Sequence, residues 1–314
     1  MSAQVDIVVV GSLNMDFVVE VTQLPLRGET VSGRGFVTLP GGKGANQACA
    51  AGRLLGRPGG GAMVGCVGDD VHGAQLIASL QAAGIDARRV RAVPDAATGV
   101  ALIVVEAGGQ NQIVVAPGAN ERLCAEEVSA ALAELGGRWL LLQLETPLDT
   151  VEAAARRARA LGMTVILDPA PARPLPAALL QQIDILTPNE SEALALAGAG
   201  GSRIDLEDAP AVAATLLAQG PRQVILKLGE QGAFLADGDT TRHFPARRVE
   251  AADATAAGDC FNGALAAGLA DGMALPEAIE FAVTAASISV TRRGAQASIP
   301  ARAEVESLLR EERR

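Results

Sequence analysis

The sequence is poor in aromatic residues, histidine and cysteine, and each shortage bears on the core or on the sites that the chain can build. Aromatic residues make up 2% of the 314 residues, so Val, Leu, Ile and Ala must supply most of the packing. Four scattered cysteines without a CxxC pair and only two histidines argue against a zinc site held by Cys and His. Free thiols in such a chain indicate a reducing, cytoplasmic compartment.

Basic charge and long apolar runs are also scarce. Lys and Arg number 26 against 36 for Asp and Glu, and the formal net charge of −10 argues against nucleic-acid binding. No apolar run approaches the ~20 residues of a membrane span, and the N-terminal residues lack the layout of a signal peptide. Hydrophobic residues still make up 49%, which is ample for a core, so we expect one α/β domain over residues 1–314.

Three common motifs are missing. The turn after the first predicted strand reads Gly11-Ser12-Leu13-Asn14-Met15-Asp16, which lacks the G-x-G-x-x-G fingerprint of dinucleotide-binding enzymes. Gly42-Lys43 is followed by Gly44 rather than Ser or Thr, which excludes a Walker P-loop. No G-x-S-x-G element is present, so the nucleophile elbow of the α/β-hydrolases is excluded as well.

What the sequence does contain is an alternation of short apolar runs with helical patterns. Strands are expected at 6–11, 62–67, 138–144, 163–168, 183–187 and 222–228. Helices are expected at 43–56, 70–84, 125–135, 149–161, 190–197 and 208–219, then twice within 257–292 and once at 304–314. This βαβ rhythm predicts a mostly parallel sheet with helices on both faces.

Four β-rich runs interrupt the alternation. They lie at 17–22, 30–38, 99–105 and 111–115, and Gly108-Gly109-Gln110-Asn111 is a strong hairpin signal between the last two. We expect a small antiparallel sheet inserted into the α/β body, formed by about residues 15–40 and 97–117. Such a sheet would serve as a lid over a site.

Two short stretches carry the chemistry. Gly41-Gly42-Lys43-Gly44-Ala45-Asn46 lets backbone approach a small ligand and offers polar groups from Lys43 and Asn46. Ala256-Ala257-Gly258-Asp259 places one carboxylate where a helix begins, and the free N–H groups there attract anions. A carboxylate at such a place can accept a proton from a hydroxyl that attacks a phosphate. Together the two stretches predict phosphoryl transfer to a sugar.

Other polar residues follow predicted strands, at the edge where α/β folds bind ligands. They are Asn14 and Asp16, Glu145, Asp168 and Asn189.

Simpler explanations exist for several candidate residues. Asp259 could only cap a helix, Lys43 could be a solvated lysine, and Glu145 could pair with a surface cation. Asp253 could only cap a turn. Asp168 precedes Pro169, which is typical of a rigid turn, and it receives no role from the sequence.

The order and spacing of the motifs resemble those of the ribokinase-like (PfkB) carbohydrate kinases over essentially the whole chain. Besides the stretches at 11–16, 41–48 and 256–263, they are Leu144-Glu145-Thr146-Pro147, Asp168-Pro169-Ala170-Pro171-Ala172, Thr187-Pro188-Asn189-Glu190 and Thr291-Arg292-Arg293-Gly294-Ala295-Gln296. The resemblance implies a three-layer sandwich with a small β lid. It also implies ATP-dependent phosphorylation of D-ribose at the 5-hydroxyl, Mg²⁺ and K⁺ as cofactors, and a homodimer formed through the lid.

The resemblance also assigns roles to residues. Sugar hydroxyls would be bound by Asn14, Asp16, Gly42, Lys43, Asn46 and Glu145, with Asp259 as the base and Ala256, Ala257 and Gly258 around the anion hole. The nucleotide and its Mg²⁺-bound waters would meet Asn189, Glu192, Lys227, Gly229, Gln231, Gly232 and Gly258. A potassium ion would be held by Asp253, Thr255, Ser289, Arg292, Gly294 and Ser298.

The chain departs from the family pattern at Lys227, Cys260 and Val283, which leaves the details of the nucleotide contacts open. Ala256 stands where many relatives carry Gly. One alternative is a kinase of the same fold that acts on deoxyribose, fructose, adenosine or pseudouridine, although the polar cluster favours a bare sugar. The other alternative is a non-catalytic sugar-binding regulator, against which the presence of both the base and the anion hole argues.

Overall fold

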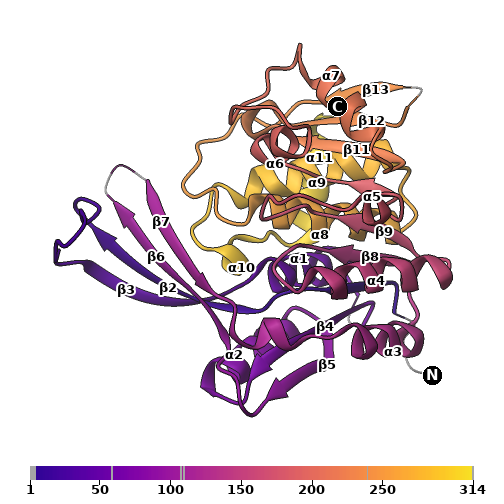
Figure 1. Cartoon of the computed structure of the whole chain (residues 1–314). Helices are drawn as coiled ribbons and strands as arrows, with labels where there is room; N and C mark the ends of the chain where they lie inside the picture. The colour runs from indigo at the N-terminus through magenta and orange to yellow at the C-terminus, as the bar shows by residue number, and fades with distance from the viewer. Residues whose placement is uncertain (1–4, 58, 107, 109, 239, 313–314) are drawn as a thin grey trace.

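A computed structural model describes residues 5–57, 59–106, 108, 110–238 and 240–312, and a nine-stranded sheet forms its centre (Figure 1). The strand order is β13-β12-β11-β10-β9-β8-β1-β4-β5. The strands are β1 (Ile7–Val10), β4 (Gly61–Gly68), β5 (Ile85–Val93), β8 (Trp139–Leu142), β9 (Thr164–Leu167), β10 (Ile185–Leu186), β11 (Gln223–Lys227), β12 (Ala233–Ala236) and β13 (Thr241–Phe244). All neighbours from β11 to β5 run parallel, and only β12 and β13 pair antiparallel, so the predicted mostly parallel sheet is confirmed.

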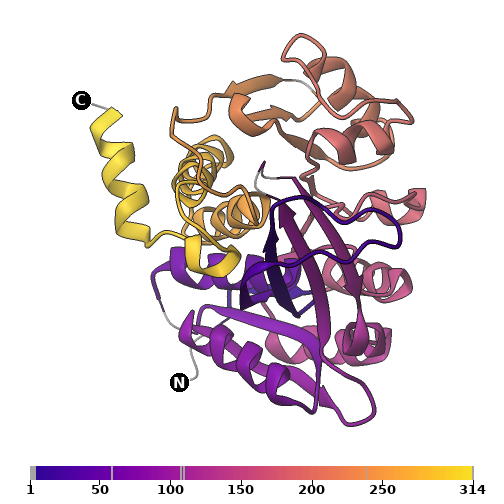
Figure 2. The ribbon, with the colours of Figure 1, turned by 90° about the vertical axis from the view of Figure 1, so that its left-hand side faces the viewer.

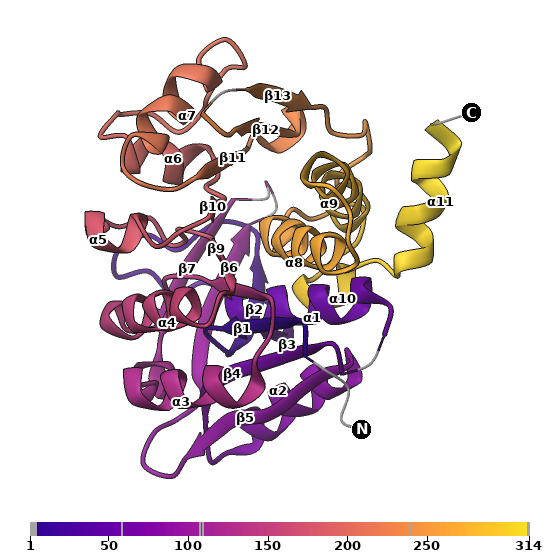
Figure 3. The same ribbon diagram turned by 90° about the vertical axis from the view of Figure 1, so that its right-hand side faces the viewer.

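Helices cover both faces of this sheet (Figure 3). One face carries α1 (Lys43–Leu55), α2 (Val71–Ala82), α8 (Ala257–Ala270) and α9 (Leu275–Ser289), with α10 (Ala295–Ser298) and α11 (Arg302–Glu312) beyond them. The other face carries α3 (Ala125–Leu135), α4 (Leu148–Ala160), α5 (Ala177–Leu180), α6 (Glu190–Leu196) and α7 (Ala209–Leu217). Each face of the sheet has its own hydrophobic core, because successive residues of a strand point to opposite faces. In β1, Ile7 and Val9 belong to the first core, and Val8 and Val10 belong to the second.

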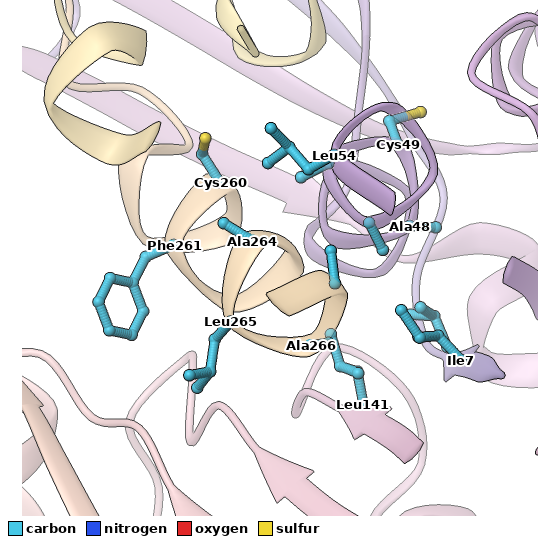
Figure 4. Close-up of a cluster of buried hydrophobic side chains, with 14 of the residues drawn as sticks. Ile7, Ala48, Cys49, Leu54, Leu141, Cys260, Phe261, Ala264, Leu265 and Ala266 are labelled. Carbon is cyan, nitrogen blue, oxygen red and sulfur yellow. The ribbon is translucent and has the colours of Figure 1, made fainter. Parts of the chain in front are cut away.

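Helices α1 and α8 pack closely, and this contact brings their N-termini together. A Cβ on Gly263 would lie 2.4 Å from the Cβ of Ala50 and 2.6 Å from the carbonyl oxygen of Gln47. Only glycine allows the two backbones this approach. Figure 4 shows Ala48, Leu54 and Leu265 in the aliphatic cluster between these helices and the sheet. Because aromatic residues are few, alanine and leucine supply most of this contact.

Most of the predicted elements are confirmed to within a few residues. The helix expected at 125–135 is α3, and those expected at 43–56 and 149–161 are α1 and α4. Strands β5, β12 and β13 were not predicted. In β5, Arg88, Arg89 and Arg91 hide the apolar alternation, and such charges are tolerated because β5 is an edge strand.

The four β-rich runs form a separate sheet that projects from the body (Figures 1 and 2). Its order is β3-β2-β6-β7, from β2 (Asn14–Val21), β3 (Arg34–Gly41), β6 (Gly99–Glu106) and β7 (Asn111–Ala116). The expectation of a purely antiparallel sheet is wrong, because the central pair β2 and β6 is parallel. Both strands leave the body from the same edge of the large sheet, so they run outward together. The β6–β7 hairpin is confirmed by its register, although Gly109 lies outside the described residues.

In the part of the chain that the structure describes, no helix combines the length and apolarity needed to cross a bilayer. Cys49, Cys66, Cys124 and Cys260 are free thiols.

Candidate active site

The start of α1 is built against the turn that follows β1. Gly42 has a φ of 88°, and a Cβ there would lie 2.6 Å from the backbone nitrogen of Asn14. A Cβ on Gly44 would lie equally close, 2.6 Å, to the backbone nitrogen of Ser12. The two glycines therefore let Lys43 and Asn46 emerge beside Asn14, at the carboxyl end of β1.

Asp259 lies in the first turn of α8 and meets Asn46 there. Its side chain is 5% exposed, with Oδ2 accepting a hydrogen bond from Nδ2 of Asn46 at 3.0 Å. Its Oδ1 accepts from Nε2 of Gln47 at 3.1 Å. Ala256, which precedes the helix, has a φ of 58°. That left-handed conformation suits glycine better than alanine.

A polar cluster continues from Asp259 toward the small sheet. Oε2 of Glu145 accepts hydrogen bonds from Oγ of Ser12 at 2.6 Å and from the backbone N–H of Lys43 at 3.1 Å. The carboxyl of Asp16 lies against Gly41, where a Cβ would approach Oδ2 to 2.2 Å. The structure thus brings together the residues predicted to bind sugar hydroxyls.

One member of this cluster was missed by the sequence reasoning. Nδ2 of Asn120 donates to Oδ1 of Asn14 at 2.8 Å and to the carbonyl of Leu13 at 3.1 Å. Asn120 belongs to the short 3-10 helix Gly118–Arg122, more than 100 residues from Asn14 along the chain. It holds the Asn14 amide in one orientation, and no local signal marks it.

Burial and mutual repulsion tune the acids of the cluster. Burial, reinforced by the charges of Glu145 and Asp259, raises the pKa of Asp16 to about 7. Burial likewise raises the pKa of Asp259 to about 6, where the Lys43 cation opposes the shift and Asp168 adds to it. A carboxylate that titrates near neutral pH is suited to act as a general base.

Lys43 is the cation at the centre of these acids. Burial alone would lower its pKa, but the carboxylates around it, Asp259 and Asp168 foremost, raise the pKa above its ordinary value. The chain contains only two lysines, Lys43 and Lys227, and both line the same cavity.

That cavity, of about 420 Å³, opens in front of the α8 N-terminus. It is lined by Lys43, Asp168, Asn189, Glu190, Ser191, Glu192, Ser202, Lys227, Gly229, Ala254, Ala256, Ala257, Gly258 and Asp259. A second cavity of about 630 Å³ shares Lys227 and Gly258 with it and continues between α8 and α9 past Phe261, Val283 and Val290. A polar chamber therefore leads into a largely apolar slot.

The predicted nucleotide residues divide between the two cavities. Asn189 and Glu192 line the polar chamber, Gly232 lines the slot, and Lys227, Gly229 and Gly258 line both. Gln231 lines neither, because its Nε2 donates to the carbonyl of Ile204 at 3.0 Å.

Asn189 and Glu192 form a reciprocal cap at the start of α6. Oδ1 of Asn189 accepts from the backbone N–H of Glu192 at 2.9 Å, and Oε2 of Glu192 accepts from the backbone N–H of Asn189 at 2.8 Å. Burial raises the pKa of Glu192. The two side chains are thus held rigidly at the wall of the polar chamber.

Asp168, to which the sequence analysis assigned no role, connects the polar cluster around Asp259 with Lys227 of the polar chamber. It is 2% exposed, and its Oδ1 accepts from Nζ of Lys227 at 2.8 Å. Its Oδ2 accepts from Nε2 of Gln47 at 2.8 Å, the same amide that reaches Asp259. The rigid-turn explanation therefore covers only part of what Asp168 does.

Of the residues predicted to hold potassium, Asp253 contacts Thr255 and Gly294, whereas the side chains of Ser289, Ser298 and Arg292 bond to other groups. Oδ2 of Asp253 accepts from the backbone N–H of Gly294 at 2.8 Å, and Oδ1 accepts from that of Thr255 at 2.9 Å. Burial would raise the pKa of Asp253, but these hydrogen bonds outweigh it and lower the pKa. The hydroxyls of Ser289 and Ser298 donate within their own segments, and the Arg292 side chain pairs with Glu304.

Residues 4–302 match the model of the pfkB family carbohydrate kinases. The chain belongs to this family. It is 41% identical over 297 residues to the ribokinase of Haemophilus influenzae, covering 94% of this chain and 95% of that protein. The family resemblance seen in the sequence is thereby confirmed.

Two solved structures are similar throughout. The ribokinase of Thermotoga maritima has a TM-score of 0.88 and 40% identity, and covers 98% of this chain and 99% of its own. The ribokinase of Arabidopsis thaliana complexed with ribose and ATP has a TM-score of 0.86 and 34% identity, with the same coverage of 98% and 99%. The predicted ribokinase-like fold is confirmed by these structures.

Proposed function

We propose that this protein transfers the γ-phosphoryl group of ATP to the 5-hydroxyl of D-ribose. The observation that carries the proposal is the position of Asp259, which contacts Asn46 of the polar cluster and also lines the polar chamber. A hydroxyl bound in the cluster would face a phosphate bound in the chamber. Asp259 takes the hydroxyl proton as the new O–P bond forms, and ADP leaves with the electrons of the broken O–P bond.

The residues of the cluster hold the sugar. Asn14, Asp16, Lys43 and Glu145 offer donors and acceptors on several sides of one small volume, which suits a polyhydroxylated ligand without a base. Backbone N–H groups of Ala257 and Gly258 at the start of α8 stabilise the charge that develops on the phosphoryl group. The left-handed conformation of Ala256 directs the chain into that turn.

The nucleotide occupies the two connected cavities, with its phosphates in the polar chamber and its base in the slot between α8 and α9. The chamber is lined by four carboxylates and two lysines, so its side chains alone do not neutralise a triphosphate. Its donor set fits Mg²⁺, whose bound waters would be held by Asn189 and Glu192. Magnesium supplies charge neutralisation of the phosphates.

We also propose a role for the small sheet, within a single kinase domain of residues 1–314. The lid, of about residues 15–40 and 97–117, covers the sugar and excludes water as a competing acceptor. Its outer strands expose large apolar side chains, among them Phe36, which is 63% exposed, and Val114. A homodimer formed through the lid would cover them. The four free thiols support a cytoplasmic location.

A substrate panel tests the function. We expect kcat/KM for D-ribose, measured by ADP release, to exceed that for deoxyribose, fructose, adenosine and pseudouridine by at least about tenfold. The reason is that a missing hydroxyl leaves buried polar groups of the cluster unpaired. A nucleoside or deoxyribose preferred by tenfold would overturn the assignment in favour of another kinase of this fold.

A potassium requirement is expected from the loop around Asp253. The Asp253 carboxylate ties the turn at Thr255 to the turn at Gly294, and a monovalent cation held by this carboxylate and by carbonyl oxygens of the two turns would brace them. The ion would fix the backbone that leads into Ala256–Gly258. We expect potassium to raise turnover by about 10- to 100-fold over a bulky organic cation, with sodium less effective.

The control for this prediction is a carboxylate away from the site. Asp253→Ala should abolish the response to potassium together with most activity, whereas Asp95→Ala, in an exposed turn after β5, should retain it. Equal rates in potassium, sodium and the organic cation at matched ionic strength would show that the Asp253 loop holds no functional ion.

A further inference from the structure

The side-chain amide of Gln47 bridges two buried carboxylates that come from opposite parts of the chain. Its Nε2 lies 2.8 Å from Oδ2 of Asp168, at the end of β9, and 3.1 Å from Oδ1 of Asp259, in α8. Gln47 itself is fully buried. An amide nitrogen has two hydrogens, and here each has a carboxylate oxygen as its acceptor.

The orientation of this amide is determined by its surroundings. Oε1 of Gln47 accepts from Nε2 of Gln143 at 2.7 Å. Exchanging the oxygen and nitrogen of Gln47 would therefore set its amide oxygen against two carboxylate oxygens and its NH₂ group against the NH₂ group of Gln143. Gln143 is itself held against Gly11, where a Cβ would lie 2.0 Å from its Oε1. A chain of two amides therefore runs from the β1 turn to Asp259.

We propose that Gln47 is the positioning residue of the catalytic base, holding Asp259 as an oriented carboxylate and linking it to the Asp168–Lys227 pair. This inference rests on the proposed kinase function. Asn46 holds the other oxygen, so the rotation of the Asp259 carboxylate is fixed at both ends. Through Asp168, the same amide connects the base to the lysine that lines both nucleotide cavities.

The charges around Asp259 set its pKa, and they show in which direction the loss of Gln47 would shift that pKa. Lys43 from α1 favours the ionised carboxylate, whereas Asp168 from β9 disfavours it and Asp16 from β2 repels it. Lys227, from the end of β11, neutralises Asp168 on the side away from Gln47. Removing the Gln47 donor takes away a hydrogen bond that favours the ionised form, so the pKa of Asp259 rises. The base is then protonated at higher pH.

Gln47→Leu and Gln47→Glu test the proposal. Leu removes the donor, and Glu keeps the size but adds a third carboxyl group beside the other two. We expect kcat with saturating Mg-ATP and ribose to fall by about 10- to 100-fold in both variants, with KM for ribose changed by less than about threefold. The acid limb of the kcat profile should move to higher pH, and farther for Glu. Asp16 is common to all these proteins and Leu adds no titratable group, so the difference between the wild-type and Gln47→Leu profiles reports Asp259.

Two further variants keep the test decisive. Gln143→Leu removes the group that orients Gln47 without touching Asp259, and it should reproduce the effect in weaker form even where a Gln47 variant fails to fold. Gln219→Leu removes an amide that donates to the carbonyl of Leu196 at 2.9 Å. Neither residue lines the two cavities, so this variant should leave kcat and the pH profile unchanged. Thermal unfolding of each variant separates a loss of fold from a loss of orientation.

The outcomes distinguish this inference from the proposed function. If the wild-type protein phosphorylates no sugar in the panel, the proposed function fails before the variants are measured. If the wild type is active and folded Gln47→Leu retains more than a third of kcat with an unmoved acid limb, Gln47 does not position the base. A loss of kcat in Gln47→Leu without any shift of the acid limb would also overturn the proposal, since it would indicate a structural role only.

Discussion

Asp259→Asn is expected to lower kcat by about 10²- to 10⁴-fold, the range for removal of a general base, with ribose binding changed little. Asn has the size of Asp but cannot take up the hydroxyl proton. Both oxygens of Asp259 accept from amide donors, those of Asn46 and Gln47, so the amide of the variant must turn its NH₂ toward one of them. That conflict is local to the side chain, and the polar groups of Asp16 and Glu145, which we propose to bind the sugar, remain.

Steady-state kinetics with ribose, together with calorimetric titration of ribose, check this result. Asp95→Asn, at an exposed turn, is the matched control and should behave as the wild type does. A folded Asp259→Asn protein that keeps more than a third of wild-type turnover would show that another group accepts the proton.

The elements that the sequence revealed are those whose signal is local. The run of valines at 8–10 indicates a buried strand, and the helix at 125–135 has clear apolar periodicity. Strand β5 lacked such a signal, because its arginines belong to an edge that faces solvent. The parallel pairing of β2 with β6 could not be predicted either, since it depends on where two distant segments leave the large sheet.

The candidate site shows the same division between local and long-range information. Asp259, Lys43 and Asn46 stand in short motifs whose glycines and alanines are unusual enough to mark them. From the sequence alone, Asp168 is interpreted as a turn residue, because its partners Lys227 and Gln47 lie 59 and 121 positions away along the chain and no local pattern reveals them. Only the order of β9, β10 and β11 in the sheet brings Lys227 to Asp168. Sequence reasoning therefore named the groups that we propose to react and missed the long-range contacts that hold them in place.

Lys43→Met is expected to lower kcat/KM for ribose by about 10²- to 10³-fold, because it removes the buried cation that compensates the surrounding carboxylates. Lys43 favours the ionised form of Asp259, whose pKa is about 6 with this lysine present. Without it the pKa of Asp259 rises further, so a larger fraction of the base is protonated at neutral pH. Activity should therefore recover in part as the pH is raised, and the acid limb should lie at higher pH than in the wild type.

Lys43→Arg separates charge from shape in this experiment. The guanidinium keeps the positive charge, so the acid limb should move back toward its wild-type position even if kcat/KM stays low. Because the pKa of Lys43 is raised, its own ionisation does not enter the assay range, and the shift reports the acids alone. Arg156→Met, on the exposed face of α4, serves as the control for loss of a cation. If the acid limb of Lys43→Met coincides with that of the wild type, Lys43 does not hold the base in its ionised form, and its contribution is confined to binding the substrates.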